Sequence, residues 1–254
     1  MAVAKGIQHS EKFKLGKRAA KRDARNLKFA AVLRAPLKLP KQYDFDKKHP
    51  GTPTPVFAND KLGDCVIAGR AHQTLRFEKI EQDKFIRITT TDVTREYYKE
   101  TGGKDTGLVV LDSLKRWRKV GWKVGKTLFQ IEAFSELNRD SHDQIKQAIV
   151  LDVGVGIGLA LPSSAETQLD DGDIWDVVAG PEGKADSWGG HYVYVCAYTE
   201  KGPVCITWGE RQQMTWKFFD KYCDEAYAII DAINTAKLKK AIDTKQLVAF
   251  LSAH

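Results

Sequence analysis

The spacing of hydrophobic and polar positions changes about halfway along the chain. In the first half, apolar residues recur every three or four positions, which is the spacing of an amphipathic helix. The segments predicted to be helical there are 65–75, 91–98, 108–120 and 141–149. Gly102-Gly103 ends the second of these helices and Gly121 the third, because glycine readily takes the conformation that follows a helix.

The second half contains runs of β-branched and aromatic residues, which are typical of strands. The predicted strands are 153–161, 191–198 and 204–208, and a turn at 200–203 joins the last two into a hairpin. Residues 214–223 are consistent with a helix or mixed structure, and 238–253 with a terminal helix. A helical first half followed by a β-rich second half predicts an α+β fold with two lobes and a cleft between them.

The N-terminal segment differs from the rest of the chain in charge. Residues 1–49 carry 14 Lys/Arg and 4 Asp/Glu, a net charge of +10, whereas the remainder carries −3. Residues 1–38 are therefore predicted to form a basic arm with little apolar surface, including a helix over 17–34 that ends before Pro36. Three interpretations of the arm stay open: a solvated tail, a segment that binds a polyanion such as nucleic acid, and a strap across the cleft.

Composition argues against several classes of protein. Hydrophobic residues make up 43% of the 254 positions, which is enough for a buried core. No run of about 18 apolar residues marks a membrane span, and no apolar signal peptide precedes the charged arm. The four cysteines contain no CxxC pair, so neither a disulfide framework nor a zinc site is expected. We therefore expect a cytoplasmic protein without a metal or another cofactor.

One cysteine stands at a position suited to nucleophilic chemistry. Cys65 follows Gly63-Asp64 at the predicted start of a helix, where free N–H groups and the helix dipole favour a thiolate. In our preferred interpretation Asp64 caps this helix, although a carboxylate there also raises the pKa of the thiol. A buried structural cysteine is the alternative that the local sequence leaves open.

A cysteine nucleophile needs a base, and His191 is the leading candidate among the six histidines. It follows Trp188-Gly189-Gly190 and opens a strand, and the glycines allow another element to approach closely. His72 lies about two helical turns beyond Cys65, too far along the axis to reach the thiol. An ordinary strand histidine is the alternative for His191.

Several segments of the chain resemble papain-like cysteine peptidases. Residues 39–45 are similar to the start of the mature enzymes, and residues 54–68 align without a gap with the segment around their catalytic cysteine. The resemblance implies that Cys65 is the nucleophile. It also implies that Asn59 takes the position of the glutamine in the oxyanion hole, with a reduced reach because asparagine is shorter.

Later segments extend this resemblance to about residue 210. Gly102-Gly103 is similar to the Gly-Gly segment of the substrate groove, and residues 143–157 are similar to the helix and strand before the catalytic histidine. Residues 190–198 match the strand that carries this histidine, and residues 206–209 match the Asn-Ser-Trp-Gly segment that follows it. The resemblance therefore implies that His191 is the catalytic base.

The resemblance also implies a division of the chain. A papain-like domain is expected over 39–235, after the arm and before a C-terminal helix over 236–254. Within this domain, the helical lobe is expected at about 60–150 and the β lobe at about 151–235. The active-site cleft would lie between the two lobes.

The residues around the histidine depart from the family pattern. The slot of the orienting asparagine holds Ile206, so Thr207 is the candidate that accepts the ring N–H of His191. Trp208 is expected to lie over the His–Thr contact and keep water away, and an ordinary core tryptophan is the alternative. Gly190 is expected to border the substrate groove.

The resemblance implies acyl transfer, most simply the cleavage of amide bonds in a peptide or protein substrate by a Cys65–His191 dyad. The departures indicate a distant relative of bacterial or phage type, for which association with a virion is a further expectation. One alternative is a weakly active or inactive papain-fold protein with a structural or interaction role. Another is a nucleic-acid-associated factor in which residues 1–38 bind a polyanion or a protein partner.

Overall fold

The computed structural model of the chain describes residues 13–231 and 236–253. Residues 1–12 of the predicted arm, and residues 232–235 where the predicted domain meets the C-terminal helix, lie outside the described residues. The helices are α1 (Phe29–Val32), α2 (Phe45–Lys48), α3 (Cys65–Gln82), α4 (Thr90–Thr101), α5 (Val110–Val120), α6 (His142–Val150), α7 (Ser164–Asp170), the 3-10 helix η1 (Pro181–Gly183), α8 (Trp216–Tyr222), α9 (Ala236–Ala241) and α10 (Thr244–Ala253). The strands are β1 (Tyr43–Asp44), β2 (Trp122–Val124), β3 (Thr127–Phe129), β4 (Ala133–Glu136), β5 (Gly154–Leu161), β6 (Gly189–Tyr198), β7 (Pro203–Thr207), β8 (Glu210–Gln213) and β9 (Cys223–Ile230).

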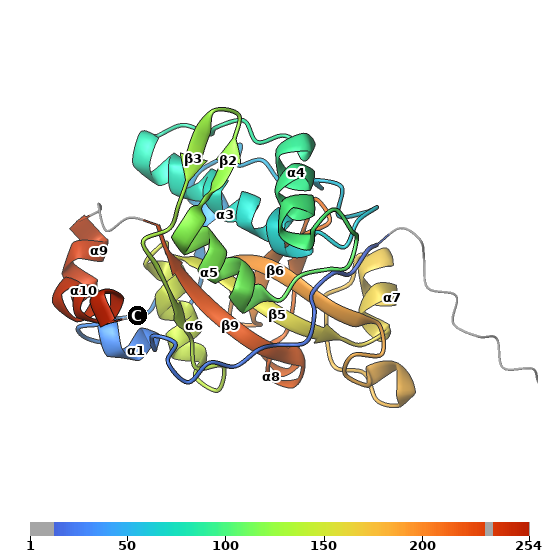
Figure 1. Cartoon of the computed structure of the whole chain (residues 1–254). Helices are drawn as coiled ribbons and strands as arrows, with labels where there is room; N and C mark the ends of the chain where they lie inside the picture. Colours follow the sequence, from blue (N-terminus) through green and yellow to red (C-terminus); the bar gives the residue numbers. More distant parts are fainter. Residues whose placement is uncertain (1–12, 232–235, 254) are drawn as a thin grey trace, which may run out of the picture.

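The two-lobed α+β architecture expected from the sequence is confirmed. One lobe holds α3, α4, α5 and the β2–β3 hairpin, and the other is built on a twisted sheet (Figure 1). This sheet is antiparallel, with the order β4-β9-β5-β6-β7-β8 and with β1 paired to β6. Helix α3 is the part of the helical lobe that packs against the sheet, so the first residue of α3 and the first residues of β6 meet at the boundary of the lobes.

Close packing fixes α3 against β6. Gly69 is the contact point, because a Cβ at this position would lie only 2.6 Å from the ring of Tyr192. Tyr192 follows His191 on β6, and Gly69 lies one helical turn after Cys65. The contact therefore holds the cysteine and the histidine on facing elements.

Helix α3 is buried along most of its length, and its two arginines are paired with carboxylates. Arg70 donates to Glu100 at 2.8 Å, and Arg76 donates to both carboxylate oxygens of Asp46 at 3.0 and 2.8 Å. Both guanidinium groups are almost fully buried. Such pairing is required because an unpaired buried charge is strongly destabilising.

The N-terminal segment is part of the folded structure. Leu27, Phe29 and Val32 are buried in the same hydrophobic cluster as the core of the β lobe. The expectation of an arm with little apolar surface is therefore wrong for this segment. The predicted helix over 17–34 is also wrong, because only α1 is helical there and the preceding residues are extended.

Other differences from the expected elements concern the edges of the sheet. The hairpin β2–β3 and the strands β4 and β9 were not expected, whereas the predicted strands agree with β5, β6 and β7. The single helix expected over 238–253 is two helices, α9 and α10, because Asp243 accepts the backbone N–H groups of Lys245 and Gln246 and starts a new helix. Within the described residues, no helix is both long and apolar enough to cross a membrane.

Candidate active site

Cys65 is the first residue of α3, as the sequence predicts. Its side chain is 1% exposed. Burial raises the pKa of the thiol to about 12, with a smaller contribution from the neighbouring Asp64. The backbone N–H groups of Tyr192 and Gly16 act in the opposite direction, since they hydrogen-bond to the sulfur. The thiol is therefore neutral in this conformation.

Asp64 does not cap the helix, contrary to our expectation. It occupies the N-cap position, but its side chain makes no capping hydrogen bond. The carboxyl group is completely buried, and burial raises its pKa to about 8. A largely protonated Asp64 near pH 7 carries little negative charge, so it opposes the ionisation of Cys65 less than an exposed aspartate would.

His191 lies near the start of β6 and is 1% exposed. Its Nε2 lies 2.8 Å from the hydroxyl oxygen of Thr207 on β7, and its Nδ1 is buried without a hydrogen-bond partner. If Nε2 carries the proton and donates it to Thr207, Nδ1 presents a free lone pair. Burial, together with the positive charge of Lys17, lowers the pKa of His191 to about 3, so the imidazole is neutral.

Trp208 covers the histidine. Its indole is stacked on the ring of His191, with 4.1 Å between the ring centroids and 9° between the planes. Trp208 takes this position with a left-handed backbone (φ +44°), a conformation that a bulky residue rarely adopts. The stacking and the hydrogen bond from its Nε1 to the carbonyl of Lys14 (3.2 Å) hold the indole in place.

Asn59 lines the same cavity as Cys65 and His191, and its side chain is 3% exposed. Its Nδ2 donates to the carbonyl of Leu62 at 3.1 Å and to the carbonyl of Lys14 at 3.4 Å. Asn59 and Trp208 thus direct two N–H groups at one peptide carbonyl of the N-terminal segment. The side-chain amide of Asn59 therefore reaches a carbonyl oxygen in the cleft, although asparagine is shorter than glutamine.

Residues 13–18, which we call the N-terminal strap, pass between the helical lobe and the sheet (Figure 1). The N–H of Leu108 donates to the carbonyl of Gly16, the N–H of Arg18 donates to the carbonyl of Leu108, and the N–H of Lys17 donates to the carbonyl of Gly190. Gly16 is needed for this path, because a Cβ there would lie 1.7 Å from the carbonyl oxygen of Gly63. The strap is thus hydrogen-bonded to both walls of the cleft.

Almost no free space remains beside the cysteine and the histidine. Cys65, His191, Asn59, Thr207 and Trp208 all line one cavity, whose volume is about 10 Å³. This volume accommodates about one water molecule at most. The sequence-predicted residues therefore come together, in a site that the chain itself fills.

The expected lining of the groove is observed only in part. Gly102 and Gly103 form the exposed turn that ends α4, and a Cβ at either position would meet nothing within 4 Å. Their place in the groove stays a prediction, and the strap hydrogen-bonds to Leu108, which no local sequence signal marks. Gly190 does border the strap, because a Cβ there would lie 2.2 Å from the carbonyl oxygen of Lys17.

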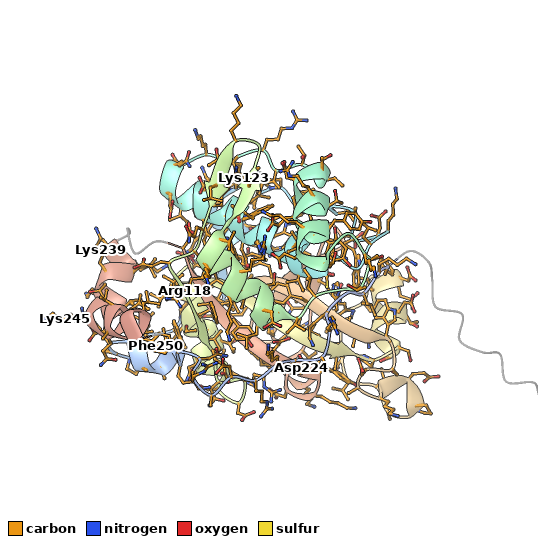
Figure 2. The ribbon with its side chains drawn as sticks, in the orientation of Figure 1. Arg118, Lys123, Asp224, Lys239, Lys245 and Phe250 are labelled. Atoms are coloured by element: carbon orange, nitrogen blue, oxygen red, sulfur yellow. The ribbon has the colours of Figure 1, made fainter. Side chains whose placement is uncertain are left out.

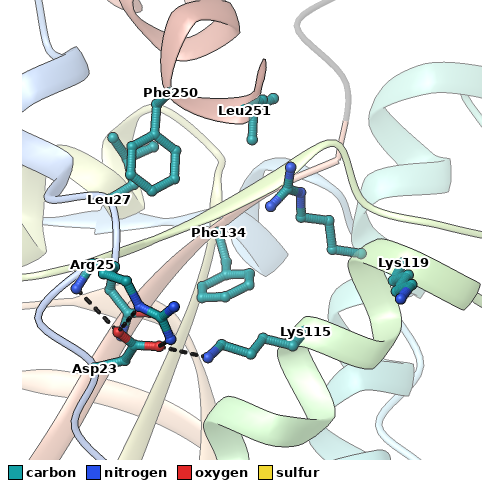
Figure 3. A pocket seen from close by; sticks show the side chains of 10 residues that line it. Asp23, Arg25, Leu27, Lys115, Lys119, Phe134, Phe250 and Leu251 are labelled. Carbon is teal, nitrogen blue, oxygen red and sulfur yellow. Dashed lines mark hydrogen bonds and ion pairs between the residues drawn. The ribbon is translucent and has the colours of Figure 1, made fainter. Parts of the chain in front are cut away.

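A larger cavity lies away from this site. It has a volume of about 660 Å³ and is bounded by the N-terminal segment, α5, β4 and α10 (Figure 3). Asp23 pairs there with Arg25 and Lys115, and Phe134 and Phe250 supply apolar surface. No group in this cavity offers a nucleophile together with a base.

One group of carboxylates among the described residues could hold a cation. Oxygen atoms of Glu78, Glu81 and Asp231 all lie within 4.8 Å of one another, far along α3 from Cys65. Burial and the neighbouring carboxylates raise the pKa of Asp231 to about 8. A proton on Asp231 that is shared with the neighbouring carboxylates is therefore sufficient to explain why these groups lie so close together.

Comparison with known proteins gives a likeness at the level of the fold. Neither a family model nor a curated protein matches the sequence. Xylellain, a cysteine protease from Xylella fastidiosa, superimposes with a TM-score of 0.66 over 90% of this chain and 100% of that one, at 15% identity. A proCathepsin B from Trypanosoma congolense gives 0.60 over 87% of each chain at 12% identity, and a Carica candamarcensis cysteine protease gives 0.56 over 76% and 99% at 14% identity. The chain therefore has the fold of the papain-like cysteine proteases.

Proposed function

We propose that the protein is a thiol-dependent acyl-transfer enzyme, a cysteine peptidase that cleaves amide bonds through Cys65 and His191. The observation that carries the proposal is the convergence of these two buried residues on one cavity, with Cys65 at a helix N-terminus and His191 held by Thr207 and Trp208. Four residues that the resemblance selects thus occupy positions that fit their proposed roles on a papain-like fold.

The proposed mechanism begins with transfer of the thiol proton of Cys65 to Nδ1 of His191, the ring nitrogen that has no other partner. The thiolate attacks the amide carbonyl, and the oxyanion accepts hydrogen bonds from the backbone N–H of Cys65 and from Nδ2 of Asn59. His191 then protonates the leaving amine, and water hydrolyses the acyl-enzyme. The hydroxyl of Thr207 keeps the imidazole in the required tautomer throughout.

A peptide substrate cannot occupy the cleft together with the strap. Turnover therefore requires that residues 13–18 leave the cleft, which also admits water around Cys65 and His191. Hydration removes the main cause of the raised thiol pKa and the lowered imidazole pKa, so the dyad becomes easier to ionise. In this proposal, the closed conformation is the inactive one.

The alternative proposal is an inactive papain-fold protein with a structural or interaction role. The filled cleft and the neutral thiol favour it, because they describe a site that is closed to substrate. The boundaries of the arm (1–38), the domain (39–235) and the C-terminal helix (236–254) stay predictions. So do a cytoplasmic or virion location and a polyanion partner.

Hydrolysis of fluorogenic peptide amides separates the two proposals. Cys65→Ser replaces the sulfur by oxygen at nearly constant shape, and we expect hydrolysis to fall by about 10³-fold or more. Cys205→Ser is the matched control, because Cys205 is also fully buried but lies on β7 among apolar residues. Equal activity of the Cys65→Ser variant and the parent would contradict the proposal. No activity toward any amide or ester, even in a Lys17→Ala protein whose strap is weakened, would favour the inactive protein.

A further inference from the structure

The cavity beside Phe250, which we call the open cavity, combines apolar surface with positive charge. Four separate parts of the chain enclose it: residues 23–27, α5, β4 and α10 (Figure 3). Its volume of about 660 Å³ falls within the range of about 300–1,000 Å³ that is typical of pockets for small molecules. It shares no lining residue with the cavity at Cys65, so any ligand that it binds is separate from the candidate dyad.

Part of the wall of the open cavity is apolar. Leu27 on the N-terminal segment and Phe134 on β4 are buried, and Phe250 and Leu251 on α10 are partly buried. Figure 3 shows Phe250, Leu251 and Leu27 gathered on one side of the cavity, opposite α5. Apolar side chains that line a recess favour a ligand with a hydrocarbon or aromatic body, because such a ligand removes their surface from water.

The rest of the wall carries an excess of positive charge. The lining contains four cations and one carboxylate, namely Arg25, Lys115, Arg118, Lys119 and Asp23. Asp23 accepts hydrogen bonds from Arg25 at 2.9 Å and from Lys115 at 2.8 Å, so two of the cations use the single carboxylate. Among the residues that the structure describes, neither Arg118 nor Lys119 forms a side-chain hydrogen bond or an ion pair.

The end of α5 is capped without help from these two side chains. Basic residues in the last turn of a helix generally stabilise it through the helix dipole and can bind its last carbonyls. In α5, however, the N–H of Gly121 donates to two carbonyls of the last turn, and Nε2 of Gln130 donates to the carbonyl of Arg118 at 2.6 Å. The charged groups of Arg118 and Lys119 therefore remain available to an anion in the cavity.

We infer that the open cavity binds a small amphipathic organic anion, such as a medium-chain carboxylate. The apolar body of the ligand lies against Phe134 and Phe250, and its head group lies at Arg118 and Lys119. A guanidinium group suits this head group, because it can donate two parallel hydrogen bonds to one carboxylate. Binding of such an anion does not require peptidase activity, because Cys65 and His191 lie outside the cavity.

A small molecule suits this cavity better than a peptide segment of a protein partner. Every residue of a peptide brings an N–H and a C=O group, and these groups need hydrogen-bond partners when they are buried. The side chains of Leu27, Phe134 and Phe250 offer none. An anion with a hydrocarbon body instead concentrates its polar atoms at the end that meets the cations.

Isothermal titration calorimetry of the full-length protein tests this ligand class with octanoate, 1-octanol and acetate. Octanoate should bind at one site with a negative change in heat capacity, the mark of apolar burial. Octanol lacks the charge and acetate lacks the chain, so each should bind at least about tenfold more weakly than octanoate. Equal affinity for octanol or for acetate would overturn the inference, and so would tighter binding of a short acidic peptide that contains phenylalanine.

Two double variants test where the head group lies. Arg118→Gln with Lys119→Gln should weaken octanoate binding by about tenfold and leave octanol binding unchanged. Lys123→Gln with Lys126→Gln is the matched control, because it removes two charges from the β2–β3 hairpin instead. Figure 2 labels Arg118 and Phe250, which border the cavity, and Lys123, which does not. Equal weakening in the two double variants would mean that net charge alone attracts octanoate, contrary to the inference.

A footprint on the parent protein avoids variants altogether. Lys119 and Lys126 are both exposed, and only Lys119 lines the cavity. Acetylation by acetic anhydride, followed by peptide mass spectrometry, should be slower at Lys119 in saturating octanoate and unchanged at Lys126. An unchanged rate at Lys119, under conditions in which calorimetry shows octanoate bound, would place the ligand elsewhere and overturn the inference.

Discussion

The cleft at Cys65 and the open cavity beside Phe250 differ in free volume and in the side chains that line them. The first has about 10 Å³ of free volume and is lined by Cys65 and His191, both buried. The second has about 660 Å³ and is lined by charged and apolar side chains, with no cysteine or histidine among them (Figure 3). The larger free volume therefore does not coincide with the proposed active site.

The reason for the difference is the path of the N-terminal segment. Residues 13–18 fill the cleft, and the chain then continues past Asp23 and Arg25 along the rim of the open cavity. One continuous segment thus closes one site and borders the other. Four changes test how far the two regions are independent.

Lys17→Ala should have the largest effect. It leaves the buried Glu225 and the half-buried Asp224 without their cation. Loss of one partner of a fully buried ion pair costs about 3–5 kcal/mol, and the partial exposure of Asp224 reduces this cost. Because this cost falls on the closed conformation, the strap should open more often. Alkylation of Cys65 by iodoacetamide at pH 6, followed by peptide mapping, should accelerate by about 100-fold. Unchanged labelling, with the protein still folded, would show that the strap is not held by Lys17.

His191 should make the stability of the fold depend on pH. Its pKa is about 3 in the folded protein and near 6.5 when unfolded, so the unfolded state binds more protons between these values. Stability should therefore fall as the pH drops below about 6.5, by about 2 kcal/mol between pH 7 and pH 5 from this group alone. Urea unfolding of the parent and of His191→Asn at both pH values isolates the contribution. Equal pH dependence in the two proteins would contradict a buried neutral imidazole.

Thr207→Val should have a smaller effect, confined to activity. The change keeps the shape but removes the oxygen that lies 2.8 Å from Nε2 of His191. Loss of one such hydrogen bond corresponds to about a tenfold fall in the acylation rate of Cys65. Thr207→Ser retains the hydroxyl and should stay close to the parent. Thr207→Asn supplies the amide that the resemblance to papain-like peptidases implies and should raise the rate. If Thr207→Val acylates as fast as the parent, another group orients the imidazole.

Arg118→Glu should have the smallest effect. Arg118 borders the open cavity, and reversing its charge changes the potential there without touching the strap or the dyad. Labelling of Cys65 and hydrolysis of peptide amides should stay within about twofold of the parent. A larger change would show that the open cavity and the cleft communicate through the N-terminal segment.

The parts of the site that could be predicted are those fixed by short local signals. The start of a helix at Cys65, the strand after His191, and the Thr207-Trp208 pair follow from local pattern and from the resemblance. Each of these residues lies in or beside a helix or strand that the local sequence predicts. The two lobes follow for the same reason.

The strap could not be predicted, because its signals point elsewhere. Alanine, lysine and arginine favour a helix over 17–34, but this preference is weak and docking in the cleft overrides it. A lysine within a basic stretch is ordinarily exposed, so nothing in the sequence marks Lys17 as buried. Its partners Asp224 and Glu225 lie about 200 residues away on a strand that was not expected.

The central claim is that Cys65 forms an acyl-enzyme. The most direct measurement is intact-mass spectrometry of the full-length Lys17→Ala protein mixed with a peptide ester and quenched in acid within milliseconds to seconds. The account predicts a mass increase equal to one acyl group, mapped to Cys65, which decays as product accumulates and is absent from Cys65→Ser. Product formation without an adduct on Cys65, or an adduct on another cysteine, would contradict the account.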